Sequence, residues 1–260
     1  MFPGAVITIG IDPEIHLGPV DLAWHGLTIA IGVGVGLLVA ARWSRSRGLD
    51  PGPLFDLMPL LVLGGIIGGR VFYVIEEGGP LIGTRGFTFA GGLILAGLLL
   101  AIEARRRRLD LRYLDVIALW LPLGVAIGRI GDVINGEHYG SASTAFYAVR
   151  NTHPDALTPN PDIAYENGGL FEVSLALLVL AAMLVLRRHL RRPGDLAWAV
   201  VGLFALGRFF EFFVRSDSPD LALGLSNAQW TSAVLLIAVV IGRFVLSSPA
   251  DRRPPTGQAP

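Results

Sequence analysis

The sequence predicts an all-α membrane protein with seven transmembrane helices, its N-terminus outside and its C-terminus in the cytoplasm. Of the 260 residues, 52% are hydrophobic and only 16% are charged, whereas soluble domains carry roughly 25% charged residues. The apolar residues form long runs, and the basic residues gather in alternate connections between them. So few charges cannot cover a water-facing surface, and so much hydrophobicity excludes a disordered chain.

The apolar runs set the expected helices, because a spanning helix needs about 20 mostly apolar residues. Seven runs meet or approach this length: Leu17–Ala41, Pro53–Ile75, Phe87–Ala104, Tyr113–Ile134, Leu170–Leu186, Leu196–Val214 and Trp230–Leu246. The third and fifth are short, so tilted or partly re-entrant helices stay open there. No basic segment or small-residue cleavage site marks the first as a signal peptide, so we expect a retained helix.

Arginine placement predicts the orientation, because cytoplasmic loops collect basic residues. All 21 basic residues are arginine, and clusters follow every odd-numbered run: Arg42, Arg45 and Arg47; Arg105 to Arg108 and Arg112; Arg187, Arg188, Arg191 and Arg192; Arg252 and Arg253. The alternate loops hold only Arg85, Arg150 and Arg215. We therefore expect the clusters inside and the alternate loops outside.

The expected domain organisation is one seven-helix transmembrane domain over residues 1–246, followed by a disordered cytoplasmic tail over 247–260. The longest connection, 135–169, is expected to be external, and a loop of this length is usually functional or a lid. Without cysteine or lysine, the chain has no thiolate nucleophile, disulfide or Schiff-base lysine. Zero net charge and arginines set between apolar runs do not predict nucleic-acid binding.

Three arginines lie within apolar runs rather than at their ends, namely Arg70, Arg129 and Arg208. A buried arginine costs roughly 2.5–3.5 kcal/mol on insertion scales, so each is a functional candidate. All three are expected in the outer half of the membrane, where together they predict an anionic ligand, and phosphate fits the guanidinium fork best. The alternative is that each arginine pairs with a carboxylate that holds helices together, or snorkels outward.

Carboxylates accompany two of these arginines. Arg208, Glu211 and Arg215 share one helical face by their spacing, so Glu211 is expected to neutralise an arginine, orient it or accept a proton. Asp132 lies one turn beyond Arg129 and is a candidate for the same roles.

The segment GRIGDVINGEHYG, residues 128–140, resembles the signature G-R-x-G-N-F-x-N-G-E-x-x-G of the prolipoprotein diacylglyceryl transferases. Segments resembling other family motifs follow in order: HLGP at 16–19 and WHGL at 24–27 (LGP…WYGL), GGRVFY at 68–73 (GGR-x-x-Y), GGLI at 91–94 (HGGLIG), LFE at 170–172 (QLYE), RFFEFFVR at 208–215 (R-F-x-x-E-F-x-R) and SNAQWTS at 226–232 (LSMGQWLS). The resemblance covers nearly the whole chain and implies seven helices with the N-terminus outside.

The resemblance implies a multi-pass enzyme of the bacterial plasma (inner) membrane. Such an enzyme moves the diacylglyceryl group of phosphatidylglycerol to the lipobox cysteine of a prolipoprotein, and glycerol phosphate leaves. Phosphatidylglycerol and the lipobox segment are then the partners, with no metal and no cofactor. This chemistry needs cations where charge develops on phosphate, and a base for the thiol proton.

The matched motifs imply roles for individual residues. Arg129 and Arg208 carry over as headgroup-phosphate residues, and with Glu211, His25 and His138 they make up the catalytic candidates. The substrate-binding candidates are Arg70, Tyr73, Asp132, Asn135, Gly136, Glu137 and Gly140.

Some polar positions depart from the family pattern. Ala90 stands in place of the histidine of HGGLIG, His25 in place of the aromatic of WYGL, and Asp132 in place of the first asparagine of the signature. We hypothesise that His25 substitutes for the missing base, with His138 as a second candidate. The alternative is that His25 only fills an aromatic's place at the interface.

Two other functions stay open at this point. A divergent member of the family would act on another lipid or acceptor, or would bind lipid or lipoprotein without catalysis. A channel or transporter would need polar residues through the full membrane depth, whereas here they lie mostly in the expected outer half, and no internal repeat supports a transporter built from inverted halves.

Overall fold

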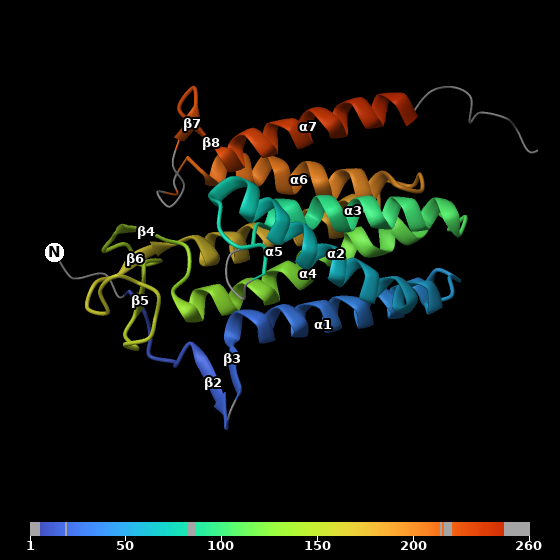
Figure 1. Ribbon diagram of the computed structural model, residues 1–260. Coiled ribbons are helices and arrows are strands. Elements are labelled where there is room, and N and C mark those ends of the chain that lie inside the picture. Colours follow the sequence, from blue (N-terminus) through green and yellow to red (C-terminus); the bar gives the residue numbers. More distant parts are fainter. Residues whose placement is uncertain (1–5, 19, 83–86, 214, 216–219, 247–260) are drawn as a thin grey trace, which may run out of the picture.

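The computed structural model describes residues 6–18, 20–82, 87–213, 215 and 220–246. The tail expected over 247–260 lies outside this range, as does Arg85. Within it, seven helices run side by side (Figure 1): α1 Trp24–Ser46, α2 Gly52–Glu77, α3 Phe89–Arg106, α4 Arg112–Asn135, α5 Gly168–Leu186, α6 Asp195–Glu211 and α7 Asn227–Leu246. Each helix coincides with one of the predicted apolar runs.

Membrane-spanning character is plain in four of these helices. By length and composition α1, α2, α4 and α5 are long and apolar enough to cross a membrane. The chain is therefore a helical membrane protein, as predicted. Helices α3 and α6 have 18 and 17 residues, close to the lower limit for a span.

The start of the first predicted run is not helical. Glu14–Leu17 (β2) and Val20–Ala23 (β3) form an antiparallel hairpin, and α1 begins only at Trp24. Gly18 takes a positive φ of 65° between the strands, which suits glycine in a tight turn. The prediction was wrong here because a short apolar stretch has no periodicity that separates strand from helix. The sixth helix likewise ends at Glu211, before the predicted Val214.

The long connection between α4 and α5 folds into a sheet rather than an irregular loop. Its strands β4 Tyr139–Ala142, β5 Val149–Asn151 and β6 Tyr165–Asn167 are joined by β1 Ile7–Ile9 in the order β1-β5-β6-β4. Strand β1 pairs in parallel with β5, and Figure 1 shows this sheet at one end of the helices. A smaller pair, β7 Asp220–Ala222 and β8 Leu225–Ser226, precedes α7.

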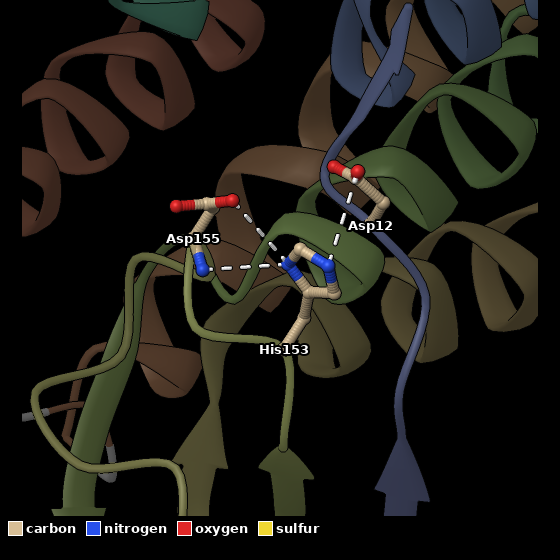
Figure 2. Close-up of side chains that lie close together, drawn as sticks. All are labelled: Asp12, His153 and Asp155. Atoms are coloured by element: carbon tan, nitrogen blue, oxygen red, sulfur yellow. Dashed lines mark hydrogen bonds and ion pairs between the residues drawn. The ribbon is translucent and has the colours of Figure 1, made fainter.

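A cluster of three side chains also ties the N-terminal segment to this connection (Figure 2). His153 Nε2 lies 3.8 Å from Asp12 Oδ2, and His153 Nδ1 accepts a hydrogen bond of 3.3 Å from the Asp155 backbone N–H. Together with the β1–β5 pairing, these contacts hold the segment before α1 over the ends of α4 and α5.

The helices associate in pairs: α1 packs along α4, α2 along α3, α4 along α5, and α6 along α7. The main apolar core lies between α4, α5 and α6 and includes Leu119, Met183 and Phe204. The α2–α3 contact depends on glycine, because a Cβ on Gly91 would lie 2.5 Å from the Gly68 carbonyl oxygen. Small residues let helix backbones approach this closely.

Candidate active site

Three arginines converge on one buried carboxylate, Glu172, near the start of α5. Glu172 is only 5% exposed. Its Oε2 pairs with Arg129 Nε of α4, and its Oε1 accepts from Arg208 Nη1 of α6. Arg215, just beyond α6, donates from Nη1 to Glu172 Oε1 at 2.9 Å and to Glu211 Oε1 at 3.0 Å. This arginine cluster (Arg129, Arg208, Arg215 and Glu172) therefore ties α4, α5 and α6 together at one end.

The residues that begin α5 place Glu172 in this position. Asn167 caps the helix by accepting a 2.9 Å hydrogen bond from the Leu170 N–H, which satisfies one of the free donors of the first turn. Gly168 leaves the space that Arg215 occupies, because a Cβ there would lie 2.8 Å from the Arg215 guanidinium carbon. The short cap and the missing side chain thus bring the carboxylate and the third arginine together.

A second buried carboxylate, Asp132, lies on the other side of Arg129. Asp132 is fully buried; its Oδ2 accepts from Arg129 Nη1, and its Oδ1 is bonded to His25 Nδ1. Gly131 allows α1 to come this close to α4, because a Cβ there would lie 2.6 Å from the His25 Cα atom. The expected Arg129–Asp132 pair is therefore present, and His25 joins it from a distant part of the sequence.

The end of α4 brings most of the predicted binding residues to the same place. Gly136 ends the helix in the left-handed conformation with φ of 73°, and the Asn135 amide donates to Glu137 Oε1 at 3.1 Å. Glu137 Oε2 lies 3.5 Å from His25 Nδ1, and His138 Nε2 lies 3.9 Å from Asp132 Oδ2. Gly140 follows in β4.

Arg70 has a different set of neighbours from Arg129 and Arg208. It lies in α2, donates to the Leu81 carbonyl at 3.1 Å and the Pro80 carbonyl at 2.6 Å, and stands 5.5 Å from the Tyr73 ring centre. The structure thus brings two of the three predicted arginines onto one carboxylate. In the described part of the chain, no contact is seen that joins Arg70 to that cluster.

Two central members of the cluster were not among the sequence-based candidates. Glu172 was noted only within a motif, and Arg215 only as a loop arginine that shares a helical face and a motif with Arg208 and Glu211. The signal for Glu172 was available, because an acidic residue within an apolar run is a functional candidate by itself. Glu211 was expected beside Arg208, and its described hydrogen bond is with Arg215.

Charge in this region is nearly balanced. Arg129, Arg208 and Arg215 face Glu172, Glu211 and Asp132, so the arginines are paired with carboxylates, which was the alternative expectation. The pairing does not seal them from the surroundings, because the Arg129 and Arg208 side chains remain 14% and 19% exposed. An anion that reaches them would exchange with a carboxylate rather than meet an isolated cation.

Among the residues that the structure describes, groups of histidine and carboxylate that could hold a metal ion occur at three places, with ligand atoms within 4.8 Å of one another. Two involve residues that precede α1: Asp12 with His153 and Asp155, and Glu14 with His16 and Asp21. The third is His25, Asp132 and Glu137, where Arg129 is already bonded to Asp132. A guanidinium on the same carboxylate opposes a dication, so we assign no metal to this group.

The fold and the site together define a helical membrane protein with an arginine–carboxylate cluster buried at one end of its helices. Residues 14–245 match the model of the prolipoprotein diacylglyceryl transferase family. The chain belongs to this family, which confirms the resemblance seen in its motifs.

Individual relatives agree with this assignment, and each is named phosphatidylglycerol–prolipoprotein diacylglyceryl transferase. The chain is 34% identical over 257 residues to that of Frankia alni, which covers 91% of this chain and 66% of the relative. It is 31% identical to those of Rhizobium leguminosarum bv. trifolii and Staphylococcus carnosus, covering 87% and 90% of their lengths. The chain thus spans slightly less than two thirds of the Frankia alni relative and 61% of that of Frankia casuarinae.

Proposed function

We propose that this chain is a transferase that moves the diacylglyceryl group of phosphatidylglycerol to the lipobox cysteine of a prolipoprotein. The observation that carries the proposal is the convergence of Arg129 and Arg208, from different helices, on the single carboxylate of Glu172. A phosphate offers oxygens that accept the same forked hydrogen bonds. Family membership and the names of the relatives supply the reaction.

The leaving group explains why the arginines matter. When the glyceryl carbon is transferred to sulfur, the phosphate gains negative charge, and donors already aimed at that position stabilise the transition state. In this proposal the headgroup phosphate takes the place of the Glu172 carboxylate as the partner of Arg129 and Arg208. Asn135 and Glu137 at the end of α4, with Gly136 and Gly140, border the same place, and Arg70 with Tyr73 contacts lipid from α2.

The proposed topology is seven spans with the N-terminus outside, the C-terminal tail inside and the site at the outer leaflet of the bacterial plasma membrane. We take residues 1–246 as the transferase domain, with 135–169 external. Support comes from the arginine clusters and from chain direction. Contacts around the arginine cluster join the starts of α1 and α5 to the ends of α4 and α6, which is the arrangement that alternating spans require.

Topology is tested with reporters fused to the chain in two places. A reporter within residues 153–163 should be accessible from outside, and one within residues 105–108 only from the cytoplasm. A swap at either position would overturn the orientation and the outer-leaflet location of the site.

The function is tested with purified protein, phosphatidylglycerol vesicles and a lipobox peptide, with the thioether product measured by mass. Arg129→Ala and Arg208→Ala should each lower transfer at least about 100-fold. Lysine at either position should restore little, since a point charge cannot make the forked contacts. Arg188→Ala, an exposed change beyond the far end of α5, is the matched control.

Each result decides between the functions. Full transfer in either alanine variant, with the protein folded and monodisperse, would overturn the role of that arginine. Absence of transfer in the unchanged protein together with retained binding of phosphatidylglycerol would favour the alternative, a family member that binds lipid without catalysis. Transfer from a different lipid or to a different acceptor would favour the divergent-substrate alternative.

A further inference from the structure

Two departures from the family pattern touch each other. His25 replaces an aromatic residue and Asp132 replaces an asparagine, at positions 107 residues apart. They lie on α1 and α4, yet His25 Nδ1 is bonded to Asp132 Oδ1. A neutral aromatic–amide pair could make a contact here but could not store a proton, whereas a histidine–carboxylate pair can. The two changes therefore form one chemical unit.

We propose that His25 and Asp132 form a dyad that removes the proton of the lipobox thiol, with His25 Nε2 as the base and Asp132 as the positioning residue. The proposal rests on the proposed function and goes further by assigning the base. A thiol with a reference pKa of about 8.5 is mostly protonated at neutral pH, so the attack on carbon needs such a group.

The geometry of Asp132 suits a positioning role. The carboxylate is completely buried, and both of its oxygens are engaged, one by Arg129 and one by His25. With Nδ1 on the carboxylate, the hydrogen of a neutral imidazole lies on Nδ1, and Nε2 presents a lone pair. The His25 side chain is 33% exposed, so this ring edge is open to a substrate. No contact of Nε2 is seen among the described residues.

Arg129 connects the dyad to the place where the phosphate would leave. The same guanidinium bonds Asp132 through Nη1 and Glu172 through Nε. The base and the leaving-group site are thus on opposite sides of one arginine, a sensible arrangement for a displacement at the carbon between them. Ala90, where the family pattern has histidine, lies in the first turn of α3, which packs along α2.

The step balances without a further reactant. The Nε2 lone pair takes the thiol proton, the sulfur forms a C–S bond to the glyceryl carbon, and the C–O bond to phosphate breaks. The electron pair stays on the phosphate oxygen, so glycerol phosphate leaves with one more negative charge than the phosphodiester carried. The imidazolium beside Asp132 then releases its proton to water.

Other charged groups surround the dyad and are the rival candidates. From α4 they are Arg129 and Asp132 itself, and from the segment after α4 they are Glu137 and His138. The 3.9 Å from His138 Nε2 to Asp132 Oδ2 is longer than a hydrogen bond, as is the 3.5 Å from Glu137 Oε2 to His25 Nδ1. Among the described residues, the side-chain hydrogen bonds of Asp132 are with His25 and Arg129, and of these two only the imidazole can serve as a base near neutral pH.

The test compares two lipobox peptides, one with cysteine and one with selenocysteine, whose selenol is already ionised at neutral pH. His25→Tyr should lower transfer to the cysteine peptide at least about 100-fold, and Asp132→Asn about 10- to 100-fold. Transfer to the selenol peptide should fall less than about tenfold in both, because no proton needs removal. Arg129→Ala should impair both peptides alike, and His189→Asn, at an exposed histidine beyond the far end of α5, is the control.

The pH profile and the double variant give readouts that a structural role would not move. Transfer to the cysteine peptide by the unchanged protein should fall at acid pH, and His25→Tyr should abolish that dependence. The double change His25→Tyr with Asp132→Asn should be no worse than His25→Tyr alone, because groups that act as one unit are not additive. Multiplied losses in the double variant would overturn the dyad.

Several results separate this proposal from the function it rests on. No transfer to either peptide by the unchanged protein contradicts the proposed function. Normal transfer by His25→Tyr in an otherwise active enzyme overturns the dyad alone, as does the same peptide pattern in His138→Ala. Loss of transfer on adding a chelator, with recovery on adding a divalent cation, would assign His25 and Asp132 to a metal and also overturn the dyad.

Discussion

Helices α2 and α3 meet through glycine, whereas α4, α5 and α6 are tied at one end through charge. In the first contact Gly68 and Gly91 let two backbones touch. In the second, Glu172 pairs with the guanidinium groups of Arg129, Arg208 and Arg215, and the same three helices also share an apolar core. Both contacts are close, but the first depends on glycines and the second on ion pairs.

The difference explains why we place the proposed phosphate site in the second region. A glycine contact depends on the small volume of its residues, so it contains no ionic partner that a ligand could replace. An arginine–carboxylate contact depends on a partner that another anion can replace. Helices joined by such bonds can bind a phosphate without losing their apolar core. A change of charge should therefore destabilise mainly the contact of α4, α5 and α6, and a change of volume should destabilise mainly the contact of α2 and α3.

Removing the central charge is expected to have the largest effect. Glu172→Gln leaves Arg129, Arg208 and Arg215 without their shared anion, and breaking a buried ion pair costs about 3–5 kcal/mol. The melting temperature of the detergent-extracted protein should fall sharply, and added inorganic phosphate should restore part of the loss. Glu103→Gln, which removes the partner of Arg106 and Arg107 on α3, is the control and should leave melting unchanged. Equal melting temperatures of the Glu172→Gln and Glu103→Gln variants would contradict the claim that the arginine cluster holds α4, α5 and α6 together.

Adding volume should have the next largest effect, now in the other region. Gly91→Val forces the α2 and α3 backbones apart, and overpacking of this kind costs about 1–3 kcal/mol. Gly97→Val on the same helix is a matched control, because a Cβ there has no atom within 4 Å among those described. Thermal unfolding of both variants in one detergent checks this, and a loss in Gly97→Val as large as in Gly91→Val would argue against the close contact.

A smaller effect is expected at the other end of α4, where the Asp115 carboxylate caps α6. Asp115 Oδ1 accepts from the Leu196 and Ala197 N–H groups at 2.9 and 3.2 Å, and Oδ2 accepts from Gly194 N–H at 2.8 Å. Asp115→Ala removes this cap of α6, which is worth about 1–2 kcal/mol. The free energy of unfolding should fall by that amount, while transfer per folded molecule is unchanged. Lost transfer in fully folded protein would show that this end also affects the site.

The smallest effect concerns the exposed hairpin before α1. The Asp21 carboxylate accepts a hydrogen bond of 2.6 Å from His16 Nδ1 across the hairpin, and this bond raises the pKa of the His16 imidazole above its usual value. Because the folded pKa is raised, this contribution to stability is present below about pH 6.5 and is lost as pH rises through the folded pKa. NMR titration should show a lower His16 pKa in Asp21→Asn, with transfer unaffected. An unchanged His16 pKa in Asp21→Asn would show that this hydrogen bond does not raise it.

Hydropathy predicted the places of the seven helices of the described chain because a long run of apolar residues can be recognised without knowledge of its neighbours in space. It did not predict the hairpin at Glu14–Ala23, since Leu17, Val20 and Leu22 suit a strand face as well as a helix. Nor did it predict the sheet around β5, whose strands are only three or four residues long.

The site was predictable only in part, for a different reason. Arg129 and Arg208 stood out because a charge within an apolar run is costly. The meeting of both with Glu172 depends on how α4, α5 and α6 are arranged side by side, which one sequence does not encode in any local pattern. The His25–Asp132 bond is of the same kind, because each partner looked like an isolated departure until α1 was placed against α4.

The parallel pairing of β1 with β5 also fixes an order of events during synthesis. Ile9 accepts a hydrogen bond from Thr152, which lies 143 residues further along the chain. Chains are made at about 5–20 residues per second, so β1 must wait on the order of ten seconds for its partner while four helices are made. The β1–β5 pair can therefore form only after α1 to α4 have been made, so the segment before α1 takes its place beside the long connection once α4 is complete.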